Sequence, residues 1–295
     1  MVQNHPTIYI VPTPIGNLED FSPHAKEILT KVSFIICEDT RHSRKLLQHF
    51  SIKNHLESLH LHNEMEKISY LIDKILASST LSAALISDAG TPCISDPGAL
   101  FIQRAHELNI QVISLPGPSS MACSLAASGF TNKRFLFSGF LERSLTEQEN
   151  EFEVWKNASP CSTIIFESPR RLISTLENIQ NYFGNTLELC VSKEISKFFE
   201  SHKKGKIEKI ISFFKEHEPQ GEFVITLNIE NVENIEDKDF TQALKKVTLL
   251  KEQGASLKEA VKEVAKLFKM NTKELYKHML SNKTEQTNEE NSHSK

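Results

Sequence analysis

Short runs of apolar and β-branched residues recur through most of the chain, separated by stretches with helical spacing. Several runs are almost continuously apolar, which is typical of strands that are buried on both faces of a sheet. Strands that alternate with helices predict an α/β fold with mainly parallel pairing, at least in the first half. We expect strands at residues 7–11, 33–37, 83–87, 111–115, 134–138, 162–166, 187–191 and 223–227.

Capping residues mark where several helices begin. Ser22 is followed by Pro23, and this pair predicts a helix start because a serine oxygen can accept a first-turn N–H and proline suits the first helical position. Further helices are expected over 98–107, with Asp96 as the cap, and over 119–128.

Changes in composition divide the chain into segments. A break rich in proline and glycine separates a first α/β domain (1–117) from a second one (118–228). A run of Glu, Asp and Asn predicts an acidic linker over 229–240, and a helical segment follows over 241–280. The tail, 281–295, lacks branched apolar residues and is expected to be disordered.

The helical segment over 241–280 is basic, with nine lysines and four glutamates. Ser256 caps one predicted helix over about 256–265, and Asn271 or Thr272 begins a second one with a possible capping box, which together predict a unit like a helix-turn-helix. Its lysines could contact RNA phosphates without reading sequence. A packing or dimerisation module is the alternative.

Composition narrows the functional classes. Hydrophobic residues make up 39 % and charged residues 24 % of the chain, and no apolar run is long enough to cross a membrane. The N-terminus lacks the basic start and apolar core of a secretory signal, so we expect a cytoplasmic protein. A net charge of −4 argues against a chain that coats nucleic acid with its whole surface, although a local basic face is still allowed.

The five cysteines are scattered and contain no CxxC pair. Cys37, Cys161 and Cys190 lie in or beside apolar runs, where buried free thiols are expected in a reducing compartment. No metal site is expected, because no ligands are paired at the spacing that zinc requires.

The first segment that could carry chemistry follows the first predicted strand. Its sequence, Pro-Thr-Pro-Ile-Gly over 12–16, predicts a rigid loop, and α/β sheets bind ligands in loops at the carboxyl ends of parallel strands. A simple tight turn is the alternative. The segment is not a GxGxxG fingerprint, so a dinucleotide-binding domain is not supported and a dehydrogenase is disfavoured.

A second segment, CEDTRHSRK over 37–45, follows the next predicted strand. A carboxylate at Glu38 or Asp39 could accept a proton or bind ribose hydroxyls at this strand end. A guanidinium at Arg41 could bind phosphate with two parallel hydrogen bonds.

The same segment opens a predicted helix over 40–49, with Asp39 or Thr40 as its cap. Arg44 and Lys45 would then lie on this helix. For these two side chains a solvated helix face is an equally good interpretation.

The third segment, ISDAGTPCISDPG over 86–98, is the most specific. It holds two glycines, two prolines and two aspartates, so it cannot be regular structure, and its backbone can approach a ligand closely at Gly90. The string LPGPSS then follows the next strand, where Ser119 is a helix cap or a ligand contact.

Seven strings in order resemble the tetrapyrrole-methylase-like class of methyltransferases that use S-adenosylmethionine (SAM), and within it the branch that acts on ribosomal RNA. They are VPTPIGNLED, CEDTRHSRKLL, LISDAGTPCISDPG, LPGPSS, FLFSGFL, FESPRRL and KEISKFFE, and they cover about residues 7–227. The resemblance implies two α/β domains, a homodimer and SAM in the cleft between the domains. It also implies a target in the small ribosomal subunit, the ribose 2′-hydroxyl of cytidine 1402 in 16S ribosomal RNA.

The resemblance also implies site residues. The SAM site would use Ile15, Gly16, Asp88, Gly90, Ile94, Ser95, Ser119, Ser120, Gly139, Phe140, Glu167 and Ser168. The RNA side would be lined by Glu38, Asp39, Arg41 and His42, with Arg170, Arg171, Lys193 and Glu194 as further contacts. Asp39 and Glu38 are the candidates for a general base.

Three positions depart from the pattern of the class. Glu142 stands where most relatives have proline, Arg170 replaces a histidine, and KEISK replaces RELTK. These changes bear on substrate contacts and not on the activity.

Two rival functions are retained. A methyltransferase of the same fold could act on a tetrapyrrole or another small molecule, although it would not need the basic EDTRHSRK string. A non-catalytic RNA-binding protein that has lost SAM is the other, and the intact SDAGTPCISDPG loop argues against it.

Overall fold

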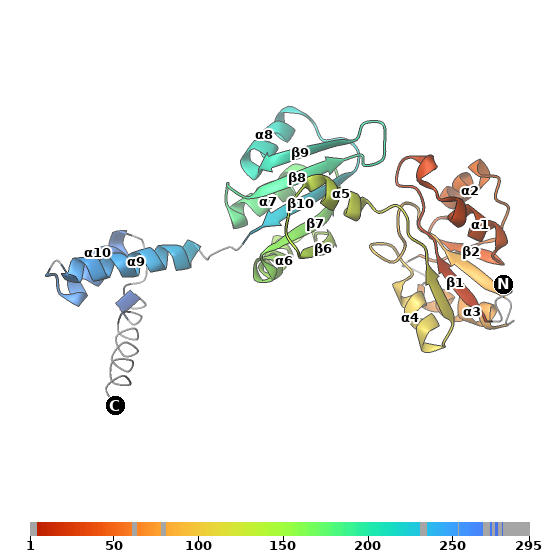
Figure 1. Ribbon diagram of the computed structural model, residues 1–295, viewed down its shortest axis with the longest axis horizontal. Coiled ribbons are helices and arrows are strands. Elements are labelled where there is room, and N and C mark those ends of the chain that lie inside the picture. The colour runs from red at the N-terminus through yellow and green to blue at the C-terminus, as the bar shows by residue number, and fades with distance from the viewer. Residues whose placement is uncertain are drawn as a thin grey trace. The chain divides into compact units, whose positions relative to one another are not determined.

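A computed structural model describes residues 5–60, 64–77, 81–230, 235–252 and 254–267, and the single positions 272, 275, 276 and 279. The chain divides into a first compact unit, Met1–Ile229, and a second unit, Glu230–Lys295 (Figure 1). The tail that was predicted to be disordered, 281–295, lies outside the described residues.

The first sheet of the first unit has the strand order β3-β2-β4-β1-β5, and all of its pairs are parallel. Its strands are β1 (Thr7–Ile10), β2 (Phe34–Cys37), β3 (Leu56–Ser58), β4 (Ser82–Leu85) and β5 (Gln111–Ser114). The predicted α/β fold and its parallel pairing are therefore confirmed. Only the short edge strand β3 gave no signal in the sequence.

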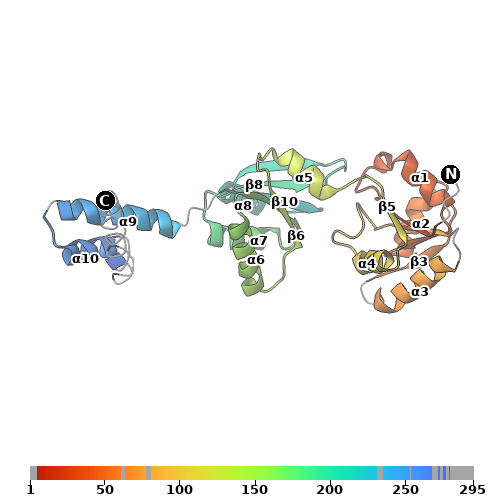
Figure 2. The same cartoon turned by 60° about the horizontal axis from the view of Figure 1, so that its bottom comes forward.

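Helices cover both faces of this sheet, which explains its continuously apolar strands. Helices α1 (Pro23–Lys31) and α2 (Thr40–His49) pack on the face that includes Ile35 and Cys37. Helices α3 (Glu64–Leu76) and α4 (Ala99–Glu107) pack on the face that includes Phe34 and Ile36 (Figure 2).

Two helix starts test the predicted caps. Ser22 caps α1 as expected, because its Oγ accepts the Ala25 N–H at 3.0 Å and Pro23 occupies the first position. The predicted Asp96 cap is wrong: α4 is capped by Gly98, with no side-chain cap bond. Gly98 has φ = 120°, and a Cβ there would lie 2.8 Å from the Leu85 side chain, so the chain needs glycine at this turn.

The second sheet has the order β6-β7-β10-β8-β9. Its strands are β6 (Phe135–Phe140), β7 (Cys161–Glu167), β8 (Glu188–Lys193), β9 (Ser201–Lys206) and β10 (Phe223–Ile229). Only the β6–β7 pair is parallel, and the other three pairs are antiparallel. Strand β9, with the sequence SHKKGK, was not predicted because a polar edge strand lacks the apolar signal.

Helix α5 (Ser120–Ser128) lies on one face of this sheet, where Ser124 Oγ lies 2.7 Å from Thr226 Oγ1 and 3.1 Å from Ser192 Oγ. The other face is covered by α6 (Leu145–Ala158), α7 (Leu172–Phe183) and α8 (Ile207–Glu216) (Figure 2). Cys161 and Cys190 are buried in this sheet and Cys37 in the first one, and all three are free thiols as predicted.

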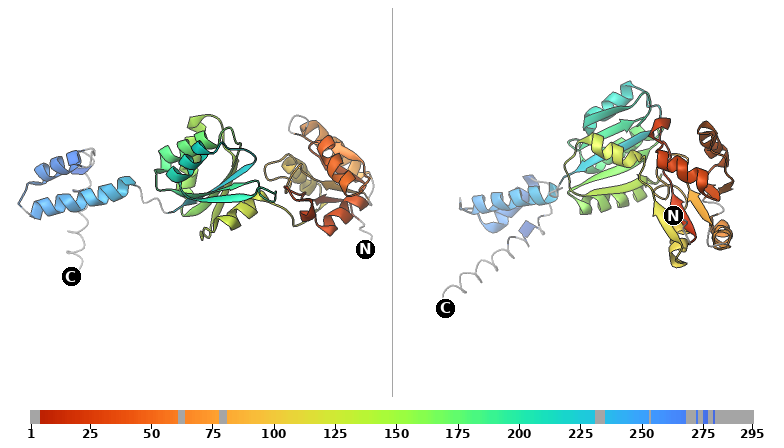
Figure 3. Two further views of the ribbon diagram at one scale, coloured as in Figure 1. Left: turned by 90° about the horizontal axis from the view of Figure 1, so that it is seen from above. Right: turned by 45° about the vertical axis from the view of Figure 1, so that its right-hand side comes forward.

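The described part of the second unit contains two long helices, and α9 (Ile235–Glu252) and α10 (Leu257–Leu267) lie side by side (Figure 3). Buried Val247 and Val261 belong to their common core. Ser256 and Glu259 form a reciprocal capping box, because the Ser256 N–H donates to Glu259 Oε2 and the Glu259 N–H donates to Ser256 Oγ.

The predicted linker over 229–240 is too long, because Ile229 ends β10 and α9 already begins at Ile235. Acidic residues stabilise the N-terminus of a helix, because it is the positive end of the helix dipole. An acidic run can therefore begin a helix as well as form a linker. Within the described ranges, every helix is too short or too polar to span a bilayer.

Candidate functional site

Parallel pairing brings the predicted loops to one edge of the first sheet. Strands β1, β2, β4 and β5 all point the same way, so the segments after them leave at their common carboxyl edge. Two of these loops are joined directly, since Thr13 and Gly90 exchange backbone hydrogen bonds of 2.9 and 3.0 Å. Gly90 has φ = 88°, which favours glycine in this bridge.

A cavity of about 450 Å³ lies against this edge and is called here the Phe166 cavity. Both sheets of the first unit contribute to its wall. The residues of the predicted SAM site that line it are Ile15, Asp88, Ser95, Ser120, Phe140, Glu167 and Ser168. Seven predicted residues from several separate segments of the chain are thus brought together around one space.

The remaining predicted SAM residues do not line the Phe166 cavity. Gly90 forms the bridge to Thr13, and Ser119 caps α5 by accepting the Ala122 N–H at 3.5 Å. Gly139 has φ = 62° at a register shift in β6. Ile94 is 41 % exposed, and Gly16 lines a neighbouring cavity.

Glu167 is buried beside the cavity and interacts with several neighbouring side chains. Its carboxylate accepts from the Ser168 N–H at 2.7 Å and from Thr175 Oγ1 at 2.6 Å, and it lies 3.5 Å from Arg171 Nε. Arg171 also donates to the Leu141 carbonyl at 2.7 Å. The guanidinium of this predicted RNA contact is therefore used to hold the loop after β6.

Sequence analysis did not assign several residues of the Phe166 cavity to the site. They are Ala89, Asp96, Phe166, Pro169, Ile195 and the segment 221–224. Asp96 was interpreted as a helix cap, and the residues from Phe166 onward lie in strands of the second sheet or in the loops beside them. Burial, together with the charge of Asp88, raises the pKa of Asp96.

The pKa values of Glu38 and Asp39 are shifted in opposite directions. Hydrogen bonds from the Arg41 side chain and backbone lower the pKa of Asp39, which also caps α2. Burial, with the nearby charges of Asp88 and Asp96, raises the pKa of Glu38. A carboxylate with a raised pKa is the better proton acceptor, so the two candidates are no longer equivalent.

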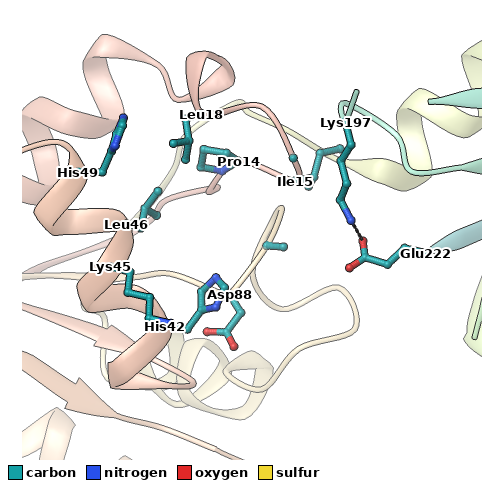
Figure 4. Close-up of a pocket in the computed structure, with 12 residues that line it drawn as sticks. Pro14, Ile15, Leu18, His42, Lys45, Leu46, His49, Asp88, Lys197 and Glu222 are labelled. Carbon is teal, nitrogen blue, oxygen red and sulfur yellow. Dashed lines mark ion pairs between the residues drawn. The ribbon is translucent and has the colours of Figure 1, made fainter. Parts of the chain in front are cut away.

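A second cavity of about 470 Å³ adjoins the first and is called here the α2 cavity (Figure 4). One face of α2 lines it with His42, Lys45, Leu46 and His49. The two cavities share part of their wall, formed by Ile15, Asp88, Ala89 and Glu222. Predicted residue His42 is thus placed beside the Phe166 cavity.

Loops from the two sheets meet at the α2 cavity. The Asn17 N–H donates to Ser196 Oγ at 3.1 Å, and Ser196 Oγ also bonds to the Asp20 carboxylate. A Cβ at Gly16 would lie 2.8 Å from the Ser196 carbonyl oxygen. This close approach explains why glycine is required at position 16.

The other predicted RNA contacts differ in their availability. Arg41 has a side chain that is 87 % exposed, and Arg170 is also exposed. Lys193, the last residue of β8, is half-buried. Glu194 is engaged within the protein, because its Oε1 accepts the Glu222 N–H at 2.8 Å and pairs with Lys197 Nζ at 3.0 Å.

In the part of the chain that the structure describes, no group of three or more His, Cys, Asp or Glu side chains could hold a metal ion.

Residues 7–211 match the model of the family described as Tetrapyrrole (Corrin/Porphyrin) Methylases. The chain belongs to this family. Its mixed α/β architecture with two sheets is therefore that of a tetrapyrrole-methylase fold.

Curated relatives cover nearly the whole chain. Ribosomal RNA small subunit methyltransferase I of Vibrio cholerae is 36 % identical over 94 % of this chain and 95 % of its own length. The protein of the same name from Synechocystis is 35 % identical over 91 % and 95 %. The one from Streptococcus pyogenes serotype M18 is 37 % identical over 92 % and 93 %.

Solved structures share the fold at low identity. Diphthine synthase has a TM-score of 0.58 and 16 % identity over 75 % of this chain and 89 % of its own. Cobalt precorrin-4 methyltransferase has a TM-score of 0.53 and 12 % identity over 75 % and 94 %. At this identity they show the fold alone.

The Phe166 cavity fits the methyl donor that the family implies. Phe140, Phe166 and Val224 give it an apolar wall, and Asp88 and Asp96 give it carboxylates. SAM has a flat aromatic adenine, which can pack on apolar side chains, and two cationic groups, the sulfonium and the ammonium. Oδ1 of Asp88 is buried and has no hydrogen-bond partner among the described residues, so it could accept a bond from a ligand amine or hydroxyl.

Proposed function

We propose that this protein transfers a methyl group from SAM to the 2′-hydroxyl of cytidine 1402 in the 16S ribosomal RNA of the small subunit. The names of the relatives that match nearly its full length support a ribosomal RNA substrate. The cytidine and the ribose oxygen come from the resemblance in the sequence motifs. Proposed partners are therefore the small ribosomal subunit and a second copy of this chain.

The observation that carries the proposal is the pair of adjoining cavities. One has the apolar and acidic wall that suits SAM, and the other is lined by the helix of the EDTRHSRK string. Ile15, Asp88 and Ala89 belong to both walls. A donor in the first cavity and a ribose in the second would meet at these shared residues.

In this proposal, SAM supplies an electrophilic methyl carbon when it is bound. Asp88 and Ser120 orient the donor, and Phe140 and Phe166 shield it from water. Glu38 accepts the proton that leaves the ribose hydroxyl, because burial keeps its carboxylate basic. Asp39 holds the start of α2 and Arg41 in place.

RNA phosphates would be bound by exposed cations around this site, with Arg170 and the Asp39-paired Arg41 as the proposed contacts at the protein surface. Lysines of the second unit add positive charge, and Lys258, Lys262 and Lys266 are exposed along α10. Such contacts weaken as salt increases.

The test is methyl transfer from labelled SAM to small subunits isolated from cells that lack this enzyme, with the modified nucleotide mapped. We expect one 2′-O-methyl group at the proposed cytidine. Incorporation at another nucleotide would keep the activity and change the target. SAM binding without incorporation, together with methylation of a tetrapyrrole precursor, would instead support a small-molecule methyltransferase.

A further inference from the structure

We propose that the α2 cavity is a phosphate site, in which Lys45 and His49 bind the backbone phosphate next to the target ribose. This inference rests on the proposed function. It assigns a role to Lys45, for which a solvated helix face was an equally good interpretation of the sequence, and to His49, which the sequence did not single out. The ligand is a phosphodiester of single-stranded RNA.

Helical spacing puts the relevant side chains on one face of α2. Positions 42, 45 and 49 are three and four residues apart, so they follow each other along the helix surface. His42, Lys45 and His49 are all exposed, and Figure 4 shows them along the side of α2 that lines the cavity. Two imidazoles and one ammonium thus line the same wall.

The basic side chains of this wall are available for a ligand. Among the described residues, His42, Lys45 and His49 form no ion pair, unlike the lysine on the opposite wall. Lys197 is 3.0 Å from both Glu194 and Glu222, so its charge is already compensated. A bound phosphate would therefore be attracted to α2 and not to the loop after β8.

The rest of the cavity suits a nucleotide. Pro14, Leu18 and Leu46 give it an apolar side on which a base or ribose can pack. Its volume of about 470 Å³ lies in the range of small-molecule sites. A phosphate on Lys45 would hold the attached ribose toward Asp88, where the wall is shared with the Phe166 cavity.

The experiment compares Lys45→Ala with Arg44→Ala on the same helix. Arg44 is also exposed and cationic but does not line the cavity, so it controls for the loss of one positive charge. KM and kcat are measured with small subunits, and SAM affinity is measured by calorimetry. A charge-assisted hydrogen bond predicts a ten- to hundredfold rise in KM for Lys45→Ala, with SAM affinity unchanged.

Lys45→Arg should have a KM close to that of the wild type, because the positive charge is kept. His49→Ala should raise KM by about three- to tenfold. In a binding assay, a labelled RNA strand with the sequence around cytidine 1402 is compared with the same strand carrying one neutral methylphosphonate next to that cytidine. With the neutral strand, the loss of RNA affinity that Lys45→Ala shows relative to the wild type should disappear.

The outcomes separate this proposal from the proposed function. Methylation by the wild type with an unchanged KM in Lys45→Ala, or an equal rise in Arg44→Ala, would overturn the phosphate site alone. A wild type that binds SAM but neither binds nor methylates RNA would overturn both.

Discussion

The two sheets of the first unit contribute to the site in different ways. In the first sheet every pair is parallel, so the strand ends bring Glu38, Asp88 and the loop around Gly16 to one edge. The second sheet is mostly antiparallel and contributes mainly apolar wall, such as Phe140 and Phe166. The parallel strands of the first sheet thus gather polar side chains at one edge of that sheet. The second sheet, with its mixed strand directions, supplies the apolar surface that faces this edge.

The largest effect should come from the first sheet. Glu38→Gln removes the proposed proton acceptor and should lower kcat by about 10²–10⁴-fold with SAM affinity unchanged. Asp39→Asn should lower kcat by less than about threefold, because asparagine also caps a helix and the Asp39 carboxylate is already engaged by Arg41. Single-turnover methylation of small subunits measures both.

The pH dependence of kcat gives a second test of the roles of Glu38 and Asp39. Glu38 must be ionised to accept a proton, and its pKa is raised by burial, so kcat should fall as pH decreases through that raised pKa. The acidic limb should persist in Asp39→Asn. If kcat of Glu38→Gln matched the wild type, the first sheet would not provide the base.

The next effect concerns the stability of the edge strand β3. Glu57 is 10 % exposed, and its carboxylate lies 2.7 Å from Lys74, 3.1 Å from His55 and 3.3 Å from Lys67. These partners outweigh the effect of burial and lower the pKa of Glu57 to about 2. Such a shift contributes about 3 kcal/mol to the free energy of unfolding.

A lowered pKa stabilises the fold above the unfolded value of 4.5, and this contribution is lost as pH falls through about 2. Glu57→Gln should therefore destabilise the protein at pH 7 and much less at pH 3, as measured by urea unfolding. Glu107→Gln, which removes an exposed pair with Arg104, should cost under about 1 kcal/mol. Equal losses in both variants would contradict the role of Glu57.

The smallest effect tests the wall from the second sheet. Gly221 and Gly184 both have positive φ angles, of 93° and 85°, so alanine strains the backbone at both positions. A Cβ at Gly221 would lie 2.6 Å from the Glu194 carboxylate, whereas a Cβ at Gly184 meets nothing within 4 Å. The added Cβ in Gly221→Ala should displace this part of the cavity wall and weaken SAM binding. A loss of ~1.4 kcal/mol in the free energy of SAM binding corresponds to about a tenfold weaker affinity.

Gly184→Ala serves as the control and should share the loss of stability but bind SAM normally. Calorimetric titration with SAM gives both affinities. If the two variants bound SAM equally well, the segment from Gly221 would not belong to the cofactor wall.

The sequence predicted the first sheet better than the second. Apolar runs located β1, β2, β4 and β5, and the polar residues directly after them marked the edge that holds the site. These signals are local, because a buried parallel strand and the loop after it are contiguous in the chain. The role of α2 was also visible in part, through Asp39 as its cap.

The unpredicted parts depend on contacts between distant segments. Strand β9 has no apolar pattern, and it exists because β8 pairs with it. Phe166 and Ile195 line the cavity only because the second sheet faces the loops of the first. For Lys45, the sequence allowed a functional role and a solvated helix face equally well, and only the folded arrangement places it in a cavity.

Strand β10 lies at the centre of the second sheet, between β7 and β8, although it is the last strand of that sheet in the chain. On the ribosome, the first sheet can close once β5 has emerged, while the second must wait for residues up to Ile229. Until then β7 and β8 lack their common neighbour. A nascent chain stalled before Phe223 would therefore expose two unpaired strand edges, and it should be recognised by chaperones more strongly than one stalled after Ile229.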